Sequence, residues 1–269
     1  MADSMDFSDD QIQRYARHIL LREVGGEGQA RLLRSKVLVV GAGGLGSPLI
    51  LYLAAAGVGT IGIVDPDVVD LSNLQRQIVH RTASVGRPKV ESAKETAAAV
   101  NPEITVVAHN KAITADNALD LISGYDLVAD GCDNFPTRFL VNDACYLAKK
   151  PLVSAAILRF DGQIYTFRPF EDGDKRPCYR CIFAEAPPPG QVPSCAEAGV
   201  LGALCGMMGS LQATEALKEL LGIGESLAGA MIICDALSAT FRKIKVKRDP
   251  ACPLCGADRT IKDLSSHAV

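Results

Sequence analysis

The chain has 269 residues, of which 48% are hydrophobic and 22% charged, and this balance is that of a globular protein rather than a disordered one. Its formal net charge of -3 gives no general attraction to nucleic acid or anionic lipid, so we expect neither as a partner, and any phosphate must be bound at a local site. Nine cysteines without an export signal disfavour a disulfide framework and favour metal binding or thiol chemistry.

The N-terminus is acidic and then amphipathic, without the basic start and apolar core of a signal peptide, so we expect a cytoplasmic protein. Ser8 and Gln11 form a capping-box pattern, and Ile12 and Tyr15 follow in helical register, which predicts a helix ahead of the first strand. The longest apolar run, 198–211, is shorter than the ~20 residues of a membrane helix and predicts a buried helix instead.

Five strand-like runs follow, mostly separated by helical patterns, and they cover residues 36–40, 60–64, 104–108, 127–130 and 152–154. Their continuous apolar character indicates a mainly parallel sheet with helices on both faces. After Asp161 the pattern alternates, which predicts one antiparallel strand within 162–170 and two within 230–249. We therefore predict an α/β, Rossmann-like fold whose mainly parallel sheet continues into antiparallel strands, with a disordered end over 262–269.

The turn after the first strand reads GAGGLG, and Gly41, Gly43 and Gly46 hold the three spaced positions of a dinucleotide-binding loop. Glycine lets the backbone approach a phosphate, and the N-terminus of the next helix offers unpaired N–H groups. Asp65 ends the second strand, where a carboxylate can accept hydrogen bonds from a ribose, although a solvated acid is the simpler alternative. These residues predict a nucleotide site without choosing between NAD and another nucleotide.

Polar and cationic residues follow the ribose-binding position. Asn73, Arg76 and Lys89 come soon after Asp65, and Lys89 opens a predicted helix. Each of them alone is most simply a surface residue in an ion pair. Together they suit reaction at a phosphorus centre, because a carboxylate that attacks an α-phosphate brings two anions together and cations must neutralise the charge. A nicotinamide enzyme needs a flat apolar pocket instead.

The segment DGCDNFPTR follows the fourth strand and contains Asp130, Asp133 and Asn134. Ligands of parallel sheets bind at the carboxyl ends of the strands, where a carboxylate can hold magnesium beside a triphosphate. We predict that Asp133 is the magnesium ligand and that Asn134 lies at the nucleotide, whereas Asp130 can instead be a structural or helix-capping acid.

Four cysteines form two C-x-x-C pairs, Cys178 with Cys181 and Cys252 with Cys255. Four thiolates satisfy tetrahedral zinc and leave no position for water, so we predict a structural zinc that clips the C-terminal strands to the rest of the domain. Redox-active pairs are the alternative.

Cys195 precedes a helical pattern whose N-terminus would lower a thiol pKa, which makes it a candidate reactive cysteine. The cysteines predicted to be core residues are Cys132, Cys145, Cys205 and Cys234. The four histidines form no metal spacing, and we assign them no role.

These segments together resemble the ThiF/MoeB/HesA family, relatives of the ubiquitin-activating enzymes. The resemblance lies in RYARHILL, GAGGLGSP, AAAGVGTIGIVDPDVVDLSNLQRQ, GRPKVESA, DGCDNFPTR, CYRC and SCAEAGVLGALCG, and it covers the chain from about Ser8 to Gly256. It implies adenylation of the C-terminal glycine of a small ubiquitin-fold sulfur carrier that ends in Gly-Gly, with ATP and magnesium as cofactors and release of pyrophosphate.

The resemblance also assigns individual residues. Those placed at the ATP are Gly44 against the nucleotide, Asp65 on the ribose, Asn73, Arg76 and Lys89 on the phosphates, and Asp133 on magnesium. Arg17 matches an arginine that the family supplies from the neighbouring subunit, which implies a homodimer with composite sites. A cysteine near Cys195 is linked covalently to the carrier in parts of the family and is dispensable in others.

The resemblance divides the single domain over 1–269 into N-terminal helices (8–34), a nucleotide-binding half (36–155), a carrier-binding and zinc half (156–256) and a tail (257–269). It implies sulfur transfer in molybdopterin, thiamin or related biosynthesis, with sulfur from another protein or a small donor, since we expect no rhodanese-like domain in this chain. The alternatives are a non-catalytic nucleotide-binding adaptor and an NAD-dependent oxidoreductase.

Overall fold

The computed structural model describes residues 7–171, 176–188, 191 and 195–267. Within that part of the chain lies one sheet in the order β3-β2-β1-β4-β5-β6-β7-β8. The strands are β1 Lys36–Val40, β2 Thr60–Val64, β3 Thr105–His109, β4 Leu127–Asp130, β5 Leu152–Leu158, β6 Asp161–Phe167, β7 Ala230–Asp235 and β8 Thr240–Lys245. Neighbours from β3 to β5 pair in parallel and those from β5 to β8 antiparallel, which confirms the predicted fold class.

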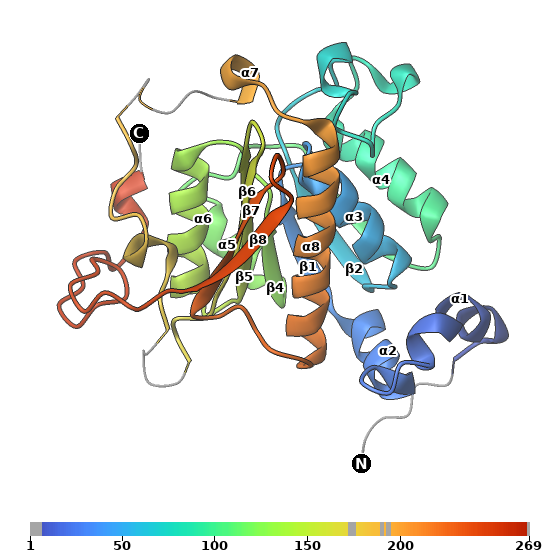
Figure 1. Ribbon diagram of the computed structural model, residues 1–269. Coiled ribbons are helices and arrows are strands. Elements are labelled where there is room, and N and C mark those ends of the chain that lie inside the picture. The colour runs from blue at the N-terminus through green and yellow to red at the C-terminus, as the bar shows by residue number, and fades with distance from the viewer. Residues whose placement is uncertain (1–6, 172–175, 189–190, 192–194, 268–269) are drawn as a thin grey trace.

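Helices cover both faces of the sheet, with α3, α4 and α8 on one face and α5 and α6 on the other (Figure 1). The helices are α1 Asp9–Ile19, α2 Gly25–Arg34, α3 Gly46–Ala55, α4 Lys89–Val100, α5 Ala118–Ser123, α6 Phe135–Leu147, α7 Cys195–Ala198 and α8 Gly202–Leu221. Short 3-10 turns are η1 Leu71–Asn73, η2 Thr82–Ser84, η4 Tyr179–Cys181 and η5 Ser265–His267.

The two-sided burial explains why the central strands are continuously apolar. Val37 and Val39 of β1 belong to the core under α3, α4 and α8, whereas Leu38 and Val40 belong to the core under α5 and α6. All four are at most 3% exposed. Because side chains alternate between the faces of a strand, a strand with a core on each side needs an apolar residue at every position.

The N-terminal capping box forms as predicted. Gln11 N donates to Ser8 Oγ, and Ser8 N donates to Gln11 Oε1, both at 3.2 Å, at the start of α1. The apolar run after residue 198 forms the first turns of α8, whose buried residues include Leu204 and Met208. Within the described part of the chain, none of the helices combines the length and apolar character that a membrane crossing requires.

Two expectations are corrected. β5 extends beyond residue 154 to Leu158, because it pairs with β6 along the whole hairpin up to the Leu158–Asp161 pair. The prediction of a disordered end is wrong as far as His267: Leu264 is 5% exposed in the core beside α6, and His267 Nε2 lies 2.8 Å from Asp143 Oδ2. A single leucine in a polar segment gives no periodic signal, so the sequence does not reveal this packing. Residues 268 and 269 lie outside the described residues.

Candidate active site

A cavity of about 650 Å³ opens where β1, β2 and β4 end. Eight residues predicted at the nucleotide line it: Gly41, Gly43, Gly44, Asp65, Arg76, Lys89, Asp133 and Asn134. We call the part of the cavity lined by these eight residues the polar end. The rest of its wall includes apolar and aromatic side chains, those of Ile157, Tyr165, Tyr179, Phe183 and Ile233, and we call this part the apolar end. The structure therefore brings most of the predicted site residues to one cavity at the edge of the sheet where parallel α/β folds bind ligands.

The glycine loop joins β1 to α3 by a turn that only small residues allow. Gly41 has a φ of +91°, a conformation that L side chains rarely adopt. A Cβ added to Gly46 would lie 1.9 Å from the carbonyl oxygen of Gly41, so the helix begins in direct contact with the turn. Gly46 is therefore a packing residue and, within the described structure, does not line the cavity.

Asp65 braces this loop from β2. Its Oδ2 accepts from Ala42 N at 2.8 Å, and its Oδ1 accepts from Asp67 N at 2.9 Å. The residue is 6% exposed and lines the cavity. Asp65 is thus a buried carboxylate next to the glycine loop rather than a solvated acid at a strand end, and its contact with a ribose stays a prediction.

Two of the cations that line the cavity, Arg76 and Lys89, were predicted from the sequence, and Lys111 and Arg138 line it as well. Lys89 is the first residue of α4, its side chain is 8% exposed, and its Nζ lies 2.7 Å from Asp67 Oδ2. Arg76 is half-buried and donates from Nη1 to the carbonyl of Ser72 at 3.2 Å. Asp67 was not predicted as a site residue; it lines the same cavity and holds the Lys89 ammonium in the wall.

The two aspartates that follow β4 have different environments. Asp130 is fully buried, and its two oxygens accept from Cys132 N at 2.9 Å and from Ser154 Oγ at 2.8 Å. Asp133 is exposed at the cavity. Asp130 is thus a buried structural acid, and the role of Asp133 as a magnesium ligand stays a prediction. Asn134 lines the cavity and also caps α6, since its Oδ1 accepts from Thr137 N at 2.9 Å.

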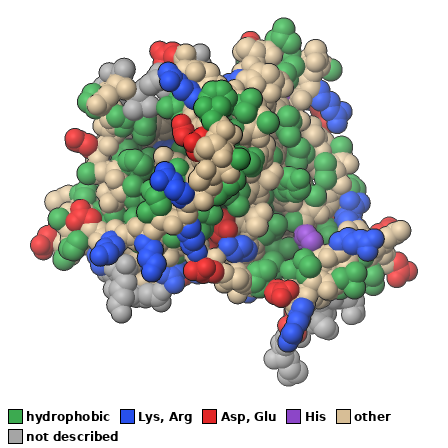
Figure 2. All heavy atoms as spheres, in the orientation of Figure 1, with side chains coloured by type: hydrophobic (Ala, Val, Ile, Leu, Met, Phe, Trp, Pro, Cys, Tyr) green, Lys and Arg blue, Asp and Glu red, His purple; other side chains and the backbone are tan. Residues whose placement is uncertain are grey.

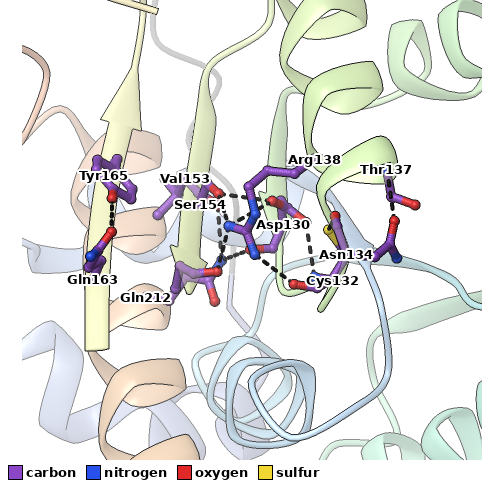
Figure 3. A network of polar contacts seen from close by, with 11 residues as sticks. Asp130, Cys132, Asn134, Thr137, Arg138, Val153, Ser154, Gln163, Tyr165 and Gln212 are labelled. Carbon is purple, nitrogen blue, oxygen red and sulfur yellow. Dashed lines mark hydrogen bonds and ion pairs between the residues drawn. The ribbon is translucent and has the colours of Figure 1, made fainter. Parts of the chain in front are cut away.

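Arg138 ties the loop that carries Asp133 to the sheet (Figure 3). Its guanidinium donates to Cys132 O at 2.7 Å, Ser154 Oγ at 2.9 Å and Ala155 O at 2.8 Å, and it lies 3.4 Å from Asp130 Oδ2. Burial disfavours its charge and is the largest single influence, but Asp130 and the weaker contributions of Cys132, Tyr179 and Tyr165 together outweigh it, so the pKa of Arg138 lies above its usual value. Both the N–H and the carbonyl of Cys132 are therefore hydrogen-bonded, which fixes the position of the backbone just before Asp133.

Besides Gly46, two predicted residues of the described structure do not line the cavity, Asn73 and Arg17, and a third, Cys195, is not tested. Asn73 closes a capping box around η1, where its Oδ1 accepts from Asp70 N at 3.1 Å. Arg17 is exposed on α1, away from the lining of its own chain. Cys195 begins the four-residue α7, but its side chain lies outside the described residues, so its reactivity stays a prediction.

The other cysteine predictions can be compared with the burial of each side chain. The four predicted as core residues are buried: Cys132, Cys145, Cys205 and Cys234. Two of these, Cys132 and Cys205, also line the cavity. Burial, together with the charge of Asp130, raises the pKa of Cys132 well above its usual value, so this thiol is protonated at neutral pH.

Sequence reasoning missed two further residues beside the glycine loop. Gln77 is 4% exposed, lines the cavity and has a carbonyl oxygen, Oε1, without a hydrogen-bond partner among the described residues. His80 is 6% exposed; its Nε2 donates to Ala42 O at 2.9 Å, and its Nδ1 lies 3.0 Å from Ser92 Oγ on α4. His80 thus connects the glycine loop to the helix of Lys89. A search for metal spacing could not detect this structural role.

His80 predicts a pH dependence of stability. Burial lowers the pKa of His80 below its usual 6.5, so the unfolded chain binds a proton more readily than the folded one. The contribution of neutral His80 is complete above pH 6.5 and is lost as the pH falls toward the lower pKa of the folded state. We expect urea unfolding to give a smaller loss of stability for His80→Gln than for the unmodified protein between about pH 7.5 and pH 5.5. Equal losses would contradict this assignment.

Four cysteine sulfurs meet between α6 and the C-terminal segment. Those of Cys178, Cys181, Cys252 and Cys255 lie within 4.8 Å of one another. The separations are 3.9 Å for Cys178–Cys181, 3.5 Å for Cys178–Cys252 and 3.4 Å for Cys181–Cys255. Zinc–sulfur bonds of about 2.3 Å give tetrahedral edges of about 3.8 Å, so this donor set fits zinc with a closed first shell. The four residues predicted from the two C-x-x-C pairs are thus confirmed as one cluster able to hold a metal ion.

Comparison with known proteins gives concordant results. Residues 15–254 match the model of the ThiF family. A sulfur carrier protein adenylyltransferase of Thermus thermophilus is 52% identical over 98% of this chain and 97% of its own length. The probable adenylyltransferase/sulfurtransferase MoeZ of Mycobacterium tuberculosis is 51% identical over 91% of this chain, which spans 63% of that protein. The mouse adenylyltransferase and sulfurtransferase MOCS3 is 51% identical over 97% of this chain, which spans 56% of that protein.

Solved structures with the same fold include those of Escherichia coli MccB. The crystal structure with MccA-N7isoASN superposes with a TM-score of 0.78 at 22% identity, over 94% of this chain and 76% of that one. The structure with ATP superposes with a TM-score of 0.77 at 22% identity, over 90% and 74%. At this identity the likeness concerns the fold alone.

Proposed function

Because this chain belongs to the ThiF family, we propose that it is an ATP-dependent adenylyltransferase that activates the C-terminal glycine of a small ubiquitin-fold sulfur carrier ending in Gly-Gly. The observation that carries the proposal is one cavity in which a glycine loop, the cations Arg76 and Lys89 and an exposed carboxylate adjoin an apolar end. Relatives that are 51–52% identical are named for adenylation of sulfur carrier proteins or for adenylation and sulfur transfer, which supports it.

The reaction is a substitution at phosphorus. A carboxylate oxygen of the carrier forms a bond to the α-phosphorus of ATP, the bond from that phosphorus to the bridging oxygen breaks, and pyrophosphate leaves with the electron pair. In this proposal Arg76 and Lys89, which line the cavity, neutralise the negative charge that gathers there, and the buried position of Lys89 strengthens its effect. The product is an acyl adenylate with AMP as a good leaving group.

Magnesium would be held by Asp133, whose exposed carboxylate lies in the cavity wall beside Asn134. Oxygen ligands of this kind suit magnesium, which usually keeps several waters and binds through one or two carboxylates and the phosphates. The ion would supply positive charge to the triphosphate and to the departing pyrophosphate. The role of this chain is to hold the carboxylate in place through Asp130 and Arg138.

We also propose a homodimer in which Arg17 completes the site of the neighbouring subunit. Arg17 is exposed on α1, and apolar side chains near it, Ile12 at 50% and Leu20 at 73%, are exposed too. Figure 2 shows hydrophobic side chains at the surface around α1 and α2, at the lower right. Contact between α1 and a second copy would bury these apolar residues. It would also bring the Arg17 guanidinium of one chain to the phosphates bound by the other.

The acyl adenylate is chemically suited to sulfur transfer. A persulfide sulfur of a donor protein can attack the activated carbonyl carbon and displace AMP. A thiol that then attacks the donor's own sulfur forms a disulfide with it and releases a thiocarboxylate on the carrier. Hydrosulfide from a small donor would displace AMP and give the thiocarboxylate directly. Cys195 is the candidate for a covalent link to the carrier. We propose that these steps occur in the cytoplasm and serve molybdopterin, thiamin or related biosynthesis.

The test is exchange of labelled pyrophosphate into ATP in the presence of magnesium, with each small carrier protein of the source organism in turn. We expect exchange with a carrier and none after removal of its terminal glycine, because the reacting carboxylate is then displaced from the α-phosphate. Exchange independent of a carrier would contradict the proposed substrate. Binding of ATP without exchange would favour the adaptor, and binding of NADH but not ATP the oxidoreductase.

A further inference from the structure

We propose that the zinc knuckle, residues 178–181, also builds one wall of the apolar end of the cavity through Tyr179. In this view the metal-binding cysteines set the affinity for the carrier's C-terminal segment, in addition to stabilising the fold. The inference rests on the proposed function, since it concerns the carrier that this cavity would receive.

Tyr179 lies between two of the cysteines that form the metal cluster. Cys178 precedes it and Cys181 follows two residues later, so the backbone of Tyr179 is constrained from both sides once the four sulfurs bind one ion. The knuckle is also anchored to α6. Tyr179 N donates to Asn142 Oδ1 at 2.9 Å, and Arg180 donates to both oxygens of the buried Asp143, the shortest distances being 2.8 Å and 2.7 Å.

The ring of Tyr179 extends from this knuckle into an aromatic group that reaches the cavity. It meets the ring of Phe139 edge-on with centroids 5.1 Å apart, and the ring of Phe183 at 4.9 Å. Tyr165 on β6 lies edge-on at 6.4 Å, and its hydroxyl donates to Gln163 (Figure 3). Tyr179, Phe183, Tyr165 and Gln163 all line the active-site cavity, so the knuckle and the cavity share a wall.

This wall belongs to the apolar end and not to the polar end. The residues of the polar end come from the glycine loop, from the chain between β2 and the start of α4, and from the β4–α6 loop, whereas Tyr179 comes from the knuckle. Tyr179 and Tyr165 are only 3% and 1% exposed, so the ring that a ligand can contact is that of the half-buried Phe183, and Tyr179 acts by holding that ring in place. A Gly-Gly segment has no side chains, so the faces of its peptide groups are available to pack on a flat aromatic ring, which suits this wall to an extended glycine tail. Loosening of the knuckle would weaken binding of the tail and leave ATP binding almost unchanged.

The first variant uses the absence of tryptophan from the sequence. Tyr179→Trp places a single fluorescent indole in the shared wall of the full-length, zinc-loaded protein. We expect its emission to shift when carrier is added, and not with carrier that lacks Gly-Gly. Removal of zinc by a strong chelator should also shift the emission. The matched control is Tyr146→Trp, because Tyr146 packs with Cys178, Cys252 and Leu254 on the zinc side; it should respond to zinc removal and not to the carrier.

The second measurement separates binding from folding. In the pyrophosphate exchange assay, Tyr179→Leu should raise the KM for carrier by about tenfold, with a KM for ATP within about twofold of the unmodified protein and normal zinc content. Tyr179→Phe keeps the ring and should restore the carrier KM. An unchanged carrier KM in a Tyr179→Leu protein that catalyses exchange overturns the inference and leaves the proposed function intact. If the unmodified protein exchanges with no carrier, the proposed function fails and the inference fails with it.

Discussion

We expect an Asp133→Asn variant to lose about a hundred- to a thousandfold in kcat for pyrophosphate exchange, because a magnesium-binding charge at a triphosphate contributes several kcal/mol to the transition state. The substitution keeps the size of the side chain. It also leaves the bonds that position the loop, since those are made by Asp130, Cys132 and Arg138. Higher magnesium concentration should restore part of the rate. This would identify the lost interaction as metal binding.

The control for this prediction is Asp120→Asn, which removes an exposed carboxylate from the first turn of α5. This helix covers the same face of the sheet as α6, the helix that follows Asp133. It should leave exchange unchanged. Both variants should retain zinc and the melting temperature of the unmodified protein. Full activity of Asp133→Asn at low magnesium would remove Asp133 from the metal-binding role.

The same variant tests whether sites are shared between subunits. Mixing Asp133→Asn protein with Arg17→Ala protein forms heterodimers in which one of the two sites has both residues, if Arg17 acts across the interface. We expect activity to recover to at most about a quarter of that of the unmodified protein, since half of the dimers are mixed and each has one complete site. Demonstrated subunit exchange without any recovery would argue for sites built within one chain.

The nucleotide half of the fold was predictable because each of its signals is local. Apolar strands, the glycine turn and Asp65 follow one another within residues 36–65, and the cavity forms where those strands end. The two C-x-x-C pairs were equally informative, although 70 residues separate Cys181 from Cys252, because chelation by thiolates has few alternatives. These features depend on residue type and spacing more than on tertiary contacts.

The remainder depends on contacts between distant segments. His80 and Tyr179 carry no spacing signal, and their roles follow from packing against the glycine loop and the aromatic wall. Arg138 was visible in DGCDNFPTR only as a charged residue on a helix, and its burial comes from β4 and β5.

The largest effect on stability is expected at Arg138. Arg138→Met leaves the Asp130 carboxylate buried without its cation, and breaking a buried pair in this way typically costs about 3–5 kcal/mol in the free energy of unfolding. Urea unfolding measures this loss. The double variant Arg138→Met/Asp130→Asn removes the isolated charge as well and should recover about half of it, because neutral partners avoid the cost of burying a lone ion.

Activity should not recover in parallel with stability. In the double variant Cys132 O still lacks the donor that Arg138 provides at 2.7 Å, so the start of the Asp133 loop is held at one side only, through Cys132 N. We therefore expect the double variant to fold and bind zinc, while its kcat for exchange stays at least about tenfold below that of the unmodified protein, because small misplacement of a catalytic group costs this much or more.

A loss below about 1 kcal/mol in the free energy of unfolding of Arg138→Met would contradict the buried pair. Equal recovery of stability and kcat would show that Arg138 acts only through folding. We expect stability and kcat to separate because the same guanidinium has two roles. It neutralises the buried Asp130, and it fixes the loop from which Asp133 reaches the cavity.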